Sequence, residues 1–299
     1  MFKIYSNEKI AAGIFKMILE APLVSATARP GQFMMIRIDE QGERIPLTIA
    51  DISDKTITIV YQIAGVTTYR LTEKKAGEYV SDVVGPLGHA TDTDKIGTVC
   101  CVGGGVGIAE LYPVAKAYKN AGNSVIIIIG ARNKELLIFK KELEFLDAEM
   151  FVVTDDGSFG EKGFVTDVLK RLLDSGRKME PTRAKARGSL GGILSPDLSY
   201  RGECINLVYA VGPGVMMEAV SNLTRPYGVK TLVSLNTVLV DGTGMCGSCR
   251  IQVGTETKFA CVDGPEFDGH LVNFKELKAR QSLFKEQENH ACKIRGIIK

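Results

Sequence analysis

The chain of 299 residues carries a compact run of candidate metal ligands toward its C-terminal end: Asp241, Cys246, Cys249 and Cys261. Thiolates at the spacing C-x4-C-x2-C…C hold 2Fe–2S clusters, and here an aspartate occupies the first cysteine position. Glycines between the ligands let the backbone wrap closely and bring amides to the sulfurs. This cysteine loop, residues 241–261, therefore predicts a site that moves electrons one at a time.

Other interpretations of the cysteine loop remain open at this point. Three cysteines and an aspartate are also a ligand set for tetrahedral zinc. Asp241 in D-G-T-G is equally typical of a turn, and the fourth ligand is then Cys204, Cys292 or Asp263. A structural disulfide is disfavoured, because nothing else in the sequence indicates a secreted chain.

Bulk composition narrows the class of protein. With 45% hydrophobic and 24% charged residues and a net charge of +2, nucleic acid is not expected as a main partner. No apolar run is long enough to span a membrane, and the N-terminal residues resemble neither a signal nor a transit peptide, so we expect a cytoplasmic protein. The three histidines, His89, His270 and His290, lack helical metal spacing and are expected to be surface or packing residues.

Three segments differ in pattern. Residues 1–95 hold short β segments separated by turn residues about every ten positions, which predicts an antiparallel β-barrel interrupted by one helix at 67–74. Residues 96–236 alternate strands and helices, which predicts an α/β domain with a parallel sheet covered on both faces. Residues 237–299 hold the cysteine loop, two short strands and a tail. A basic insertion at 177–203 is either a solvated loop or a docking segment for a partner.

Glycine turns end several strands of the predicted parallel sheet. Gly103–Gly107 follows a buried strand and opens a helix, which offers backbone amides to a phosphate. It departs from the usual dinucleotide fingerprint, because Glu110 stands where the third glycine is expected. Turns at 154–158 and 212–214 end two further strands, and ligands of such sheets bind at the carboxyl ends of the strands. We therefore expect one nucleotide-binding crevice.

The barrel half contains a second possible phosphate site. Arg44 and Thr48 alternate on one predicted strand and can reach a phosphate together. Residues 65–68 precede a helix and offer amides and hydroxyls. Taken alone, these are equally a solvated strand charge and a helix cap.

These motifs together resemble a known family. R-x-P-L-T, G-x-T-T and G-G-G-V-G, in this order, resemble the ferredoxin–NADP reductase superfamily. The cysteine loop narrows the resemblance to the group of the dihydroorotate dehydrogenase electron-transfer subunit. D-G-T-G-M-C-G-S-C with A-C-V-D-G-P-E-F-D is more similar to a sister branch, the small subunit of electron-bifurcating NADH-dependent ferredoxin:NADP oxidoreductase, also known as a sulfide dehydrogenase subunit. The resemblance covers nearly the whole chain except the insertion.

The resemblance implies three cofactors. It implies FAD in the barrel at Arg44, Pro46, Leu47, Thr48, Tyr61, Gly65, Val66, Thr67 and Thr68. It implies NAD(H) at Gly104, Gly105, Val106, Gly107, Arg132, Asp155, Gly212, Pro213 and Met216. It implies a 2Fe–2S cluster on Asp241, Cys246, Cys249 and Cys261. No catalytic acid or base is expected, because the cofactors carry the chemistry.

The resemblance also implies a larger flavin and iron–sulfur partner subunit, in a heterodimer or higher assembly that bifurcates electrons. Alternatives are a subunit of a dihydroorotate dehydrogenase-type or sulfide dehydrogenase complex, a free-standing NADH:acceptor reductase, and a zinc-stabilised binding protein. The choice between NAD and NADP stays open, since Arg132 favours a 2′-phosphate whereas the resemblance favours NAD.

Overall fold

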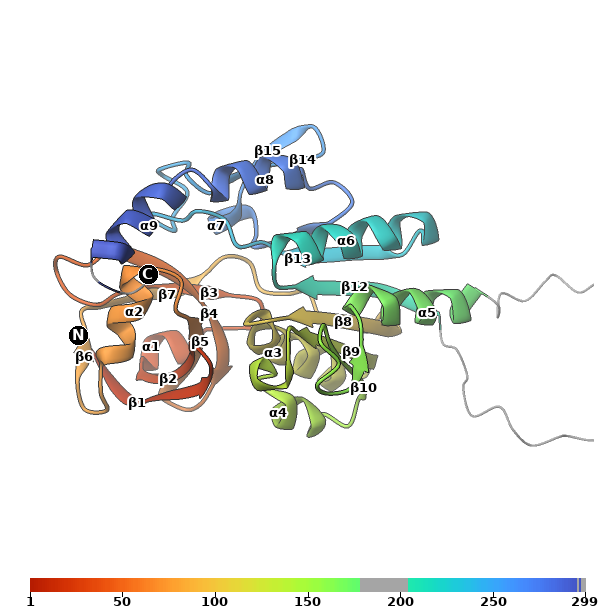
Figure 1. Ribbon diagram of the computed structural model, residues 1–299, viewed down its shortest axis with the longest axis horizontal. Coiled ribbons are helices and arrows are strands. Elements are labelled where there is room, and N and C mark those ends of the chain that lie inside the picture. Colours follow the sequence, from red (N-terminus) through yellow and green to blue (C-terminus); the bar gives the residue numbers. More distant parts are fainter. Residues whose placement is uncertain (178–203, 295, 297–299) are drawn as a thin grey trace, which may run out of the picture.

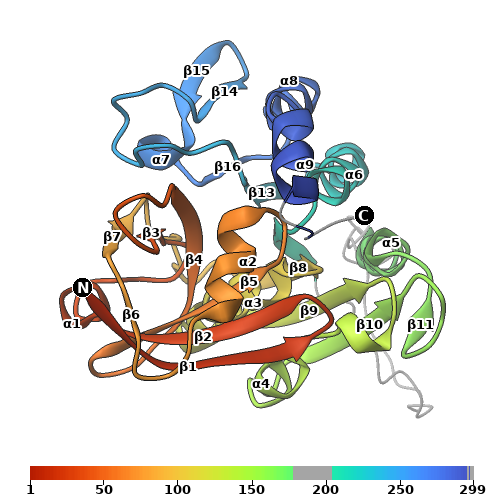
Figure 2. The same ribbon diagram turned by 60° about the vertical axis from the view of Figure 1, so that its left-hand side comes forward.

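The computed structural model describes residues 1–177, 204–294 and 296; the insertion predicted at 177–203 lies outside this part of the chain apart from its first residue. Seven antiparallel strands form the first sheet, in the order β6-β1-β2-β5-β4-β3-β7. They are β1 (Phe2–Ala11), β2 (Ile14–Glu20), β3 (Phe33–Arg37), β4 (Arg44–Ile52), β5 (Thr56–Gln62), β6 (Tyr79–Val80) and β7 (Asp82–Leu87). Helices α1 (Pro22–Ser25) and α2 (Val66–Glu73) interrupt them. The predicted barrel is confirmed as a nearly closed sheet (Figure 2).

Alternation along β4 shows why this barrel forms. Ile45, Leu47 and Ile49 pack into the barrel core, together with residues such as Met17 and Leu19 of β2. Successive side chains of a strand point to opposite faces, so the positions between them face away from this core. One strand thus supplies both the barrel interior and an outer face for binding.

The second sheet is the predicted α/β sheet, in the order β11-β10-β9-β8-β12-β13-β16. Its strands are β8 (Thr98–Gly104), β9 (Ser124–Ala131), β10 (Glu149–Thr154), β11 (Glu161–Lys162), β12 (Ile205–Val211), β13 (Lys230–Ser234) and β16 (Glu266–Asp268). All neighbours pair in parallel except β13 and β16. The associated helical segments are α3 (Gly107–Asn120), η1 (Lys134–Leu136), α4 (Lys140–Glu144), α5 (Val165–Arg177), α6 (Gly214–Thr224) and η2 (Arg225–Tyr227).

Helices cover both faces of this sheet, with α3 and α4 on one side and α5 and α6 on the other (Figure 1). The uninterrupted isoleucine run of β9 follows from this arrangement. Ile126 and Ile128 pack against α5 and its neighbours, whereas Ile127 and Ile129 pack against α3 and α4. A strand buried on both faces needs apolar side chains at every position.

The C-terminal part crosses between the two sheets. It contains β14 (Arg250–Val253), β15 (Glu256–Phe259), α7 (Ala260–Asp263), α8 (Phe274–Gln281) and α9 (Lys285–Ile294). β16 pairs with β13, which anchors this part to the second sheet. The tail, for which the sequence indicated no structure, forms α8 and α9, and α9 lies beside α2 of the barrel (Figures 1 and 2). The domain limits at 95/96 and 236/237 stay predictions.

Among the described residues, no helix has both the length and the apolar character that a membrane crossing requires.

Candidate cofactor sites

A cavity of about 1120 Å³ lies where the barrel, the second sheet and the C-terminal part meet; we call it the central cavity. Its size is that of a site for a large cofactor, since small-molecule pockets span roughly 300–1,000 Å³. The lining comes from β3, β4, β5, the start of α2, the start of α3, the segment after β13, and α9. The lining residues used below are Arg37, Glu43, Arg44, Pro46, Leu47, Thr48, Tyr61, Gly65, Val66, Thr67, Thr68, Val106, Glu110, Ser234, Phe284, Gln287, Glu288 and Ala291.

Strand β4 presents the predicted residues to this cavity. Arg44 and Thr48 share the strand face opposite the core residues, as the sequence predicted, and Pro46 lies between them. The Arg44 guanidinium is 3.5 Å from the Asp82 carboxylate and is half exposed, so it retains donors for an anion. Leu47 also borders the cavity but packs mainly against the barrel core.

Tyr61, which is predicted to bind the cofactor, directs its hydroxyl into the barrel. It borders the cavity, but its ring is buried and stacks on Phe15 at 5.8 Å between ring centroids. Its hydroxyl donates to Asn7 Oδ1 at 2.9 Å, and burial raises its pKa to about 12. The polar atom of Tyr61 is therefore committed to the barrel interior.

The two threonine hydroxyls at the start of α2 make local hydrogen bonds. The Thr68 hydroxyl accepts the amides of Ala64 and Gly65 at 2.9 and 3.0 Å, and the Thr67 hydroxyl donates to Glu43. Both hydroxyls predicted to meet a phosphate are thus used locally. The amides of the first turn, from Val66 on, lack acceptors within any helix, and they remain the groups that fit a phosphate.

Glu110 is a titratable group in the central cavity. From the sequence it has no assigned role and is identified only as the residue in place of a glycine of the dinucleotide fingerprint. It lies in the first turn of α3 and is partly buried. Burial raises the pKa of its carboxyl to about 7, and the Thr48 side chain, which lines the same cavity, works in the opposite direction.

The predicted nucleotide crevice is built from turns that pack against one another. A Cβ on Gly104 would lie 2.5 Å from the Met216 sulfur, and one on Gly107 would lie 2.7 Å from the Val211 carbonyl oxygen. Gly105 has φ +58° and no heavy atom within 4 Å of the position of a Cβ. Glycine therefore permits the close approach of the two turns and leaves open space at Gly105 for a ligand.

The other predicted residues of this crevice lie at the same edge of the sheet. Arg132 follows β9 and Asp155 follows β10, and the Asp155 amide donates to the Ala131 carbonyl at 3.1 Å. β10, β9, β8 and β12 are neighbours and parallel, so their carboxyl ends and following turns share one edge. Both side chains are exposed there, and Val106 of the same edge borders the central cavity. The crevice thus adjoins the cavity.

The cysteine loop brings two of its four predicted ligands together. Cys249 and Cys261 are buried, and their Sγ atoms lie 3.2 Å apart. Burial and the neighbouring Cys249 thiol raise the pKa of Cys261. Cys246 is exposed, and its Sγ lies 2.9 Å from the Ser248 hydroxyl.

Asp241 caps the cysteine loop. Its two carboxylate oxygens accept the amides of Thr243 at 2.9 Å and Cys246 at 2.8 Å, which lowers its pKa. No three His, Cys, Asp or Glu side chains in the described part of the chain are arranged to hold a metal ion. A loop with two adjacent thiols and two more donors at its rim fits a cluster whose binding completes the fold of the loop.

The alternative fourth ligands lie in other surroundings. Cys204 precedes β12 and its thiol donates to the Gly176 carbonyl, and Cys292 is buried on α9. The Asp263 carboxylate accepts the Phe259 amide at 2.6 Å. The assignment of Asp241 as the fourth ligand stays a prediction.

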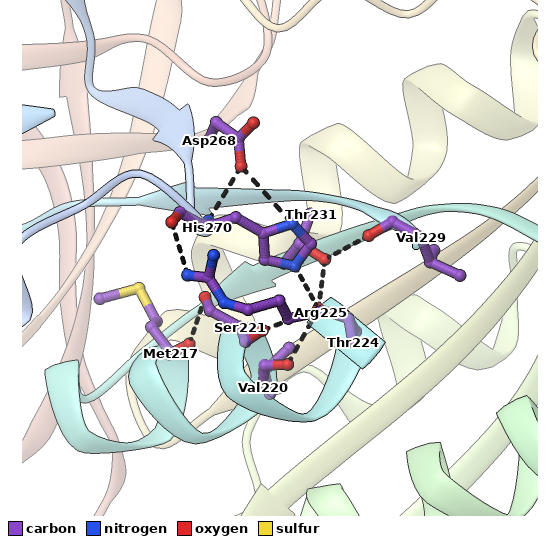
Figure 3. Close-up of polar contacts among 9 residues, drawn as sticks. All are labelled: Met217, Val220, Ser221, Thr224, Arg225, Val229, Thr231, Asp268 and His270. Carbon is purple, nitrogen blue, oxygen red and sulfur yellow. Dashed lines mark hydrogen bonds and ion pairs between the residues drawn. The ribbon is translucent and has the colours of Figure 1, made fainter. Parts of the chain in front are cut away.

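His270 occupies a buried polar network rather than a catalytic one (Figure 3). Its Nε2 is 2.9 Å from the Thr224 hydroxyl, and Nδ1 is 4.0 Å from Asp268. The order hydroxyl–imidazole–carboxylate resembles that of hydrolases, but Thr224 is fully buried and the second distance exceeds hydrogen-bond range. The network ties the segment after β16 to α6, as expected for a packing histidine.

The barrel, the glycine turns at one edge of a parallel sheet and the cavity between them define a fold of the ferredoxin–NADP reductase type. A cytochrome P450 reductase from Amycolatopsis shares this fold, with a TM-score of 0.58 over 76% of this chain and 65% of that chain at 20% identity. Residues 236–273 match the family model of the iron–sulfur cluster binding domain of dihydroorotate dehydrogenase B.

Relatives over the full length are more specific. The electron-transfer subunit homologue of dihydroorotate dehydrogenase B from Thermotoga maritima is 43% identical over 288 residues, 96% of this chain and 92% of its own. The electron-transfer subunit from Geobacillus thermodenitrificans is 31% identical over 88% of this chain and 94% of its own. The chain belongs to the family of these electron-transfer subunits and their homologues, which confirms the resemblance seen in the motifs.

A solved structure of an NADH-dependent reduced ferredoxin–NADP oxidoreductase, studied for flavin-based electron bifurcation, is also similar. It matches with a TM-score of 0.84 and 41% identity, and the match covers 98% of this chain and 97% of that one.

Proposed function

We propose that this chain is an electron-transfer subunit that passes electrons between NAD(H), FAD and a 2Fe–2S cluster. The observation that carries the proposal is the presence of the central cavity, the glycine-turn crevice and the cysteine loop in one chain of this family. When bound, FAD exchanges two electrons with a nicotinamide and one electron with a cluster, which links the two carriers.

The residues of the chain bind and orient these groups. Arg44 and the first-turn amides of α2 offer positive potential to the phosphates of FAD, and Pro46 and Thr48 line its cavity. Gly104, Gly105, Val106 and Gly107, with Arg132, Asp155, Gly212, Pro213 and Met216, form the crevice for NAD(H). Asp241, Cys246, Cys249 and Cys261 hold the cluster.

A larger flavin and iron–sulfur partner subunit covers the cysteine loop in this proposal. Three apolar side chains of the loop and its border are exposed: Val240, Met245 and Val262. Exposed apolar groups beside a redox centre fit a contact face that excludes water. Electron bifurcation belongs to the same proposal and rests on the similarity to the bifurcating oxidoreductase. A heterodimeric or higher assembly rests on the relatives that are electron-transfer subunits, and a cytoplasmic location is the expectation from the sequence.

A second candidate is the electron-transfer subunit of a dihydroorotate dehydrogenase-type complex, which the match of residues 236–273 favours. The two candidates share the cofactors of this chain and differ in the partner. The aspartate in the first ligand position favours the bifurcating branch.

The test is a visible spectrum and cofactor extraction on the chain purified with its bound partner. We expect stoichiometric FAD, equal amounts of iron and acid-labile sulfide, and bleaching by NADH. A colourless protein that contains zinc would indicate the zinc-stabilised alternative. Full NADH:acceptor turnover by the chain alone, with no second chain co-purifying, would indicate a free-standing reductase.

A further inference from the structure

Two arginines bind the turn at residues 246–249, which joins two of the predicted cluster ligands. Arg280 of α8 donates from Nη2 to the Ser248 carbonyl at 2.7 Å. Arg250 of β14 donates from Nη1 to the Gly247 carbonyl at 3.2 Å. Both carbonyls between the two cysteines are therefore bound by guanidinium groups, and cofactor binding assigns neither arginine a role.

The direction of these carbonyls fixes the direction of the amides in the turn. A trans peptide is planar, so its N–H points opposite to its C=O. The Gly247 carbonyl faces its arginine, and the N–H of the same peptide, that of Ser248, lies 3.5 Å from Cys246 Sγ as its donor. The Ser248 carbonyl faces Arg280, so the Cys249 N–H points away from the guanidinium. Hydrogen bonds to the ligand sulfurs are among the factors that set the potential of a cluster.

Helix α8 holds Arg280 in place. Phe274 and Leu277 of this helix are buried in the core that it shares with the second sheet. Lys278 pairs with Glu218 of α6 at 2.5 Å. Arg280 itself is partly buried, and its hydrogen bond joins residues 32 positions apart. A donor on a packed helix thus determines the direction of a peptide in the cysteine loop.

The contact of Arg280 lies at the end of the turn that is already in place. Cys249 is buried, and its Sγ lies beside that of Cys261. The groups that ligand binding must rearrange are Cys246 and Asp241, whose polar atoms are used within the loop. Arg280 therefore bonds a part of the loop that keeps its position when a cluster binds.

The charge of Arg280 is not neutralised by an acidic side chain. Among the residues that the structure describes, no Asp or Glu carboxylate lies within ion-pair distance of its guanidinium. A guanidinium stays protonated at all ordinary pH values. A positive charge beside a redox centre favours the form that has gained an electron, and partial burial weakens the screening of this effect by salt.

We propose that Arg280 is a positioning residue of the 2Fe–2S site that raises the reduction potential of the bound cluster. It holds the Ser248 peptide in one orientation, and it keeps a positive charge beside the turn. Reduction adds one electron and no proton, so the charge of Arg280 is the same before and after the step and favours the reduced form. Arg250 makes a longer hydrogen bond and is exposed, so its contribution is smaller.

The inference rests on the proposed function, because it needs a bound cluster. Arg280→Met in the holoprotein removes the charge and the donors and keeps an apolar stem. Arg280→Lys keeps a charge and a donor. Lys278→Gln is the matched control, since it removes one positive charge and one contact from the same helix. The midpoint potential of the cluster is measured by redox titration followed by EPR, with iron and FAD content determined on the same samples.

We expect the equilibrium constant for reduction of the cluster to fall about tenfold in Arg280→Met, which is about 59 mV for one electron. Arg280→Lys should restore most of this shift in potential. Lys278→Gln should stay within about twofold of wild type, because its charge is exposed and paired with Glu218. FAD content should be the same in all four proteins.

A potential in Arg280→Met equal to that of wild type would overturn the inference alone. An equal shift in Lys278→Gln would overturn it too, since a general loss of charge or of α8 packing explains both. If Arg280→Met holds no cluster, recovery of the cluster in Arg280→Lys supports the inference, and failure to recover it overturns the inference. Wild-type protein without FAD and iron would overturn the proposed function, and the inference with it.

Discussion

The central cavity and the cysteine loop are built over very different lengths of chain. Residues that line the cavity range from Phe33 on β3 to Ala291 on α9, and they meet only where both sheets and the C-terminal helices pack together. The ligands of the cysteine loop all lie within 241–261. Packing of the folded chain forms the cavity walls and leaves polar groups for a ligand; among the described residues, the buried Arg37 Nε and Thr237 Oγ1 of the lining have no hydrogen-bond partner. The cysteine loop, by contrast, pairs its polar groups with one another.

This difference teaches how each site acquires its cofactor. The cavity is already formed in the folded chain without a ligand. FAD affinity should therefore depend on single contacts of the cofactor with the residues that line the cavity. The loop places Cys246 against Ser248 and Asp241 against backbone amides, so ligand binding must rearrange it. The two cofactors should therefore be lost independently of each other.

Cys261→Ser gives the largest expected effect. Removing one of the two adjacent buried thiols should abolish the 2Fe–2S signal in the EPR spectrum of reduced protein, because a cluster needs all four ligands. FAD content should stay at the wild-type level. Cys204→Ser and Cys292→Ser are the controls, and loss of the cluster in either would move the fourth ligand away from Asp241.

The buried carboxyl of Glu110 should make the stability of the protein depend on pH. Its pKa is raised from 4.5 to about 7, so the folded state binds more protons than the unfolded state between these values. The stability that this group contributes is present below about pH 4.5 and is lost as pH rises through 7. On flavin-free protein, the unfolding free energy of wild type relative to Glu110→Gln should fall by about 2–3 kcal/mol from pH 4.5 to 8 in urea titrations. A constant difference would contradict the buried carboxyl.

Arg44→Ala should weaken FAD binding about 10- to 100-fold, because a hydrogen bond to a charged group contributes roughly 1.5–3 kcal/mol. Flavin fluorescence on titration with FAD reports the affinity. The cluster signal should not change, and Arg29→Ala, on the exposed surface of the barrel, should bind FAD normally. Full FAD occupancy at low FAD concentration in Arg44→Ala would remove Arg44 from the site.

Phe284→Ala tests whether α9 is a wall of the FAD site. Phe284, Gln287, Glu288 and Ala291 follow the spacing of one helical face and line the cavity. Phe284 is exposed in the structure, and bound FAD would cover part of its ring. Loss of the ring should therefore lower FAD affinity about 3- to 10-fold, on the order of 1 kcal/mol. Glu286→Ala, on the opposite face of α9, should leave the affinity unchanged, and equal effects of both would assign α9 a purely structural role.

Asp241→Cys should change the cluster without removing it. A thiolate releases more electron density to iron than a carboxylate, so the EPR spectrum and the midpoint potential of the cluster should both change. Asp241→Asn, which keeps an oxygen acceptor for the loop amides, should lower the cluster content instead. Identical spectra for wild type and Asp241→Cys would make Asp241 a turn residue only.

Patterns within short segments of the sequence predicted the features that form within a single strand or loop. Alternation in β4 predicted that Arg44 and Thr48 share one face, and the alternation of strands and helices in 96–236 predicted a parallel sheet covered on both faces. The period of apolar residues along a strand or helix indicates which of its sides is buried, because apolar side chains are stabilised by burial in the core. The spacing of the cysteine loop and of the glycine turn was visible for the same reason, since each lies in one short segment.

Only the tertiary structure decided which distant elements share a site. Residues 281–290 of α8, α9 and their connection are all exposed, so no apolar pattern indicated that α9 lies across the cavity from β4. The hydroxyls of Thr67 and Thr68 were predicted to meet a phosphate, but Glu43 and the local amides use them. Glu110 and Thr48 line the same cavity although they lie 62 positions apart by residue number. A contact between residues so far apart depends on how whole elements pack, and no spacing within a single sequence records it.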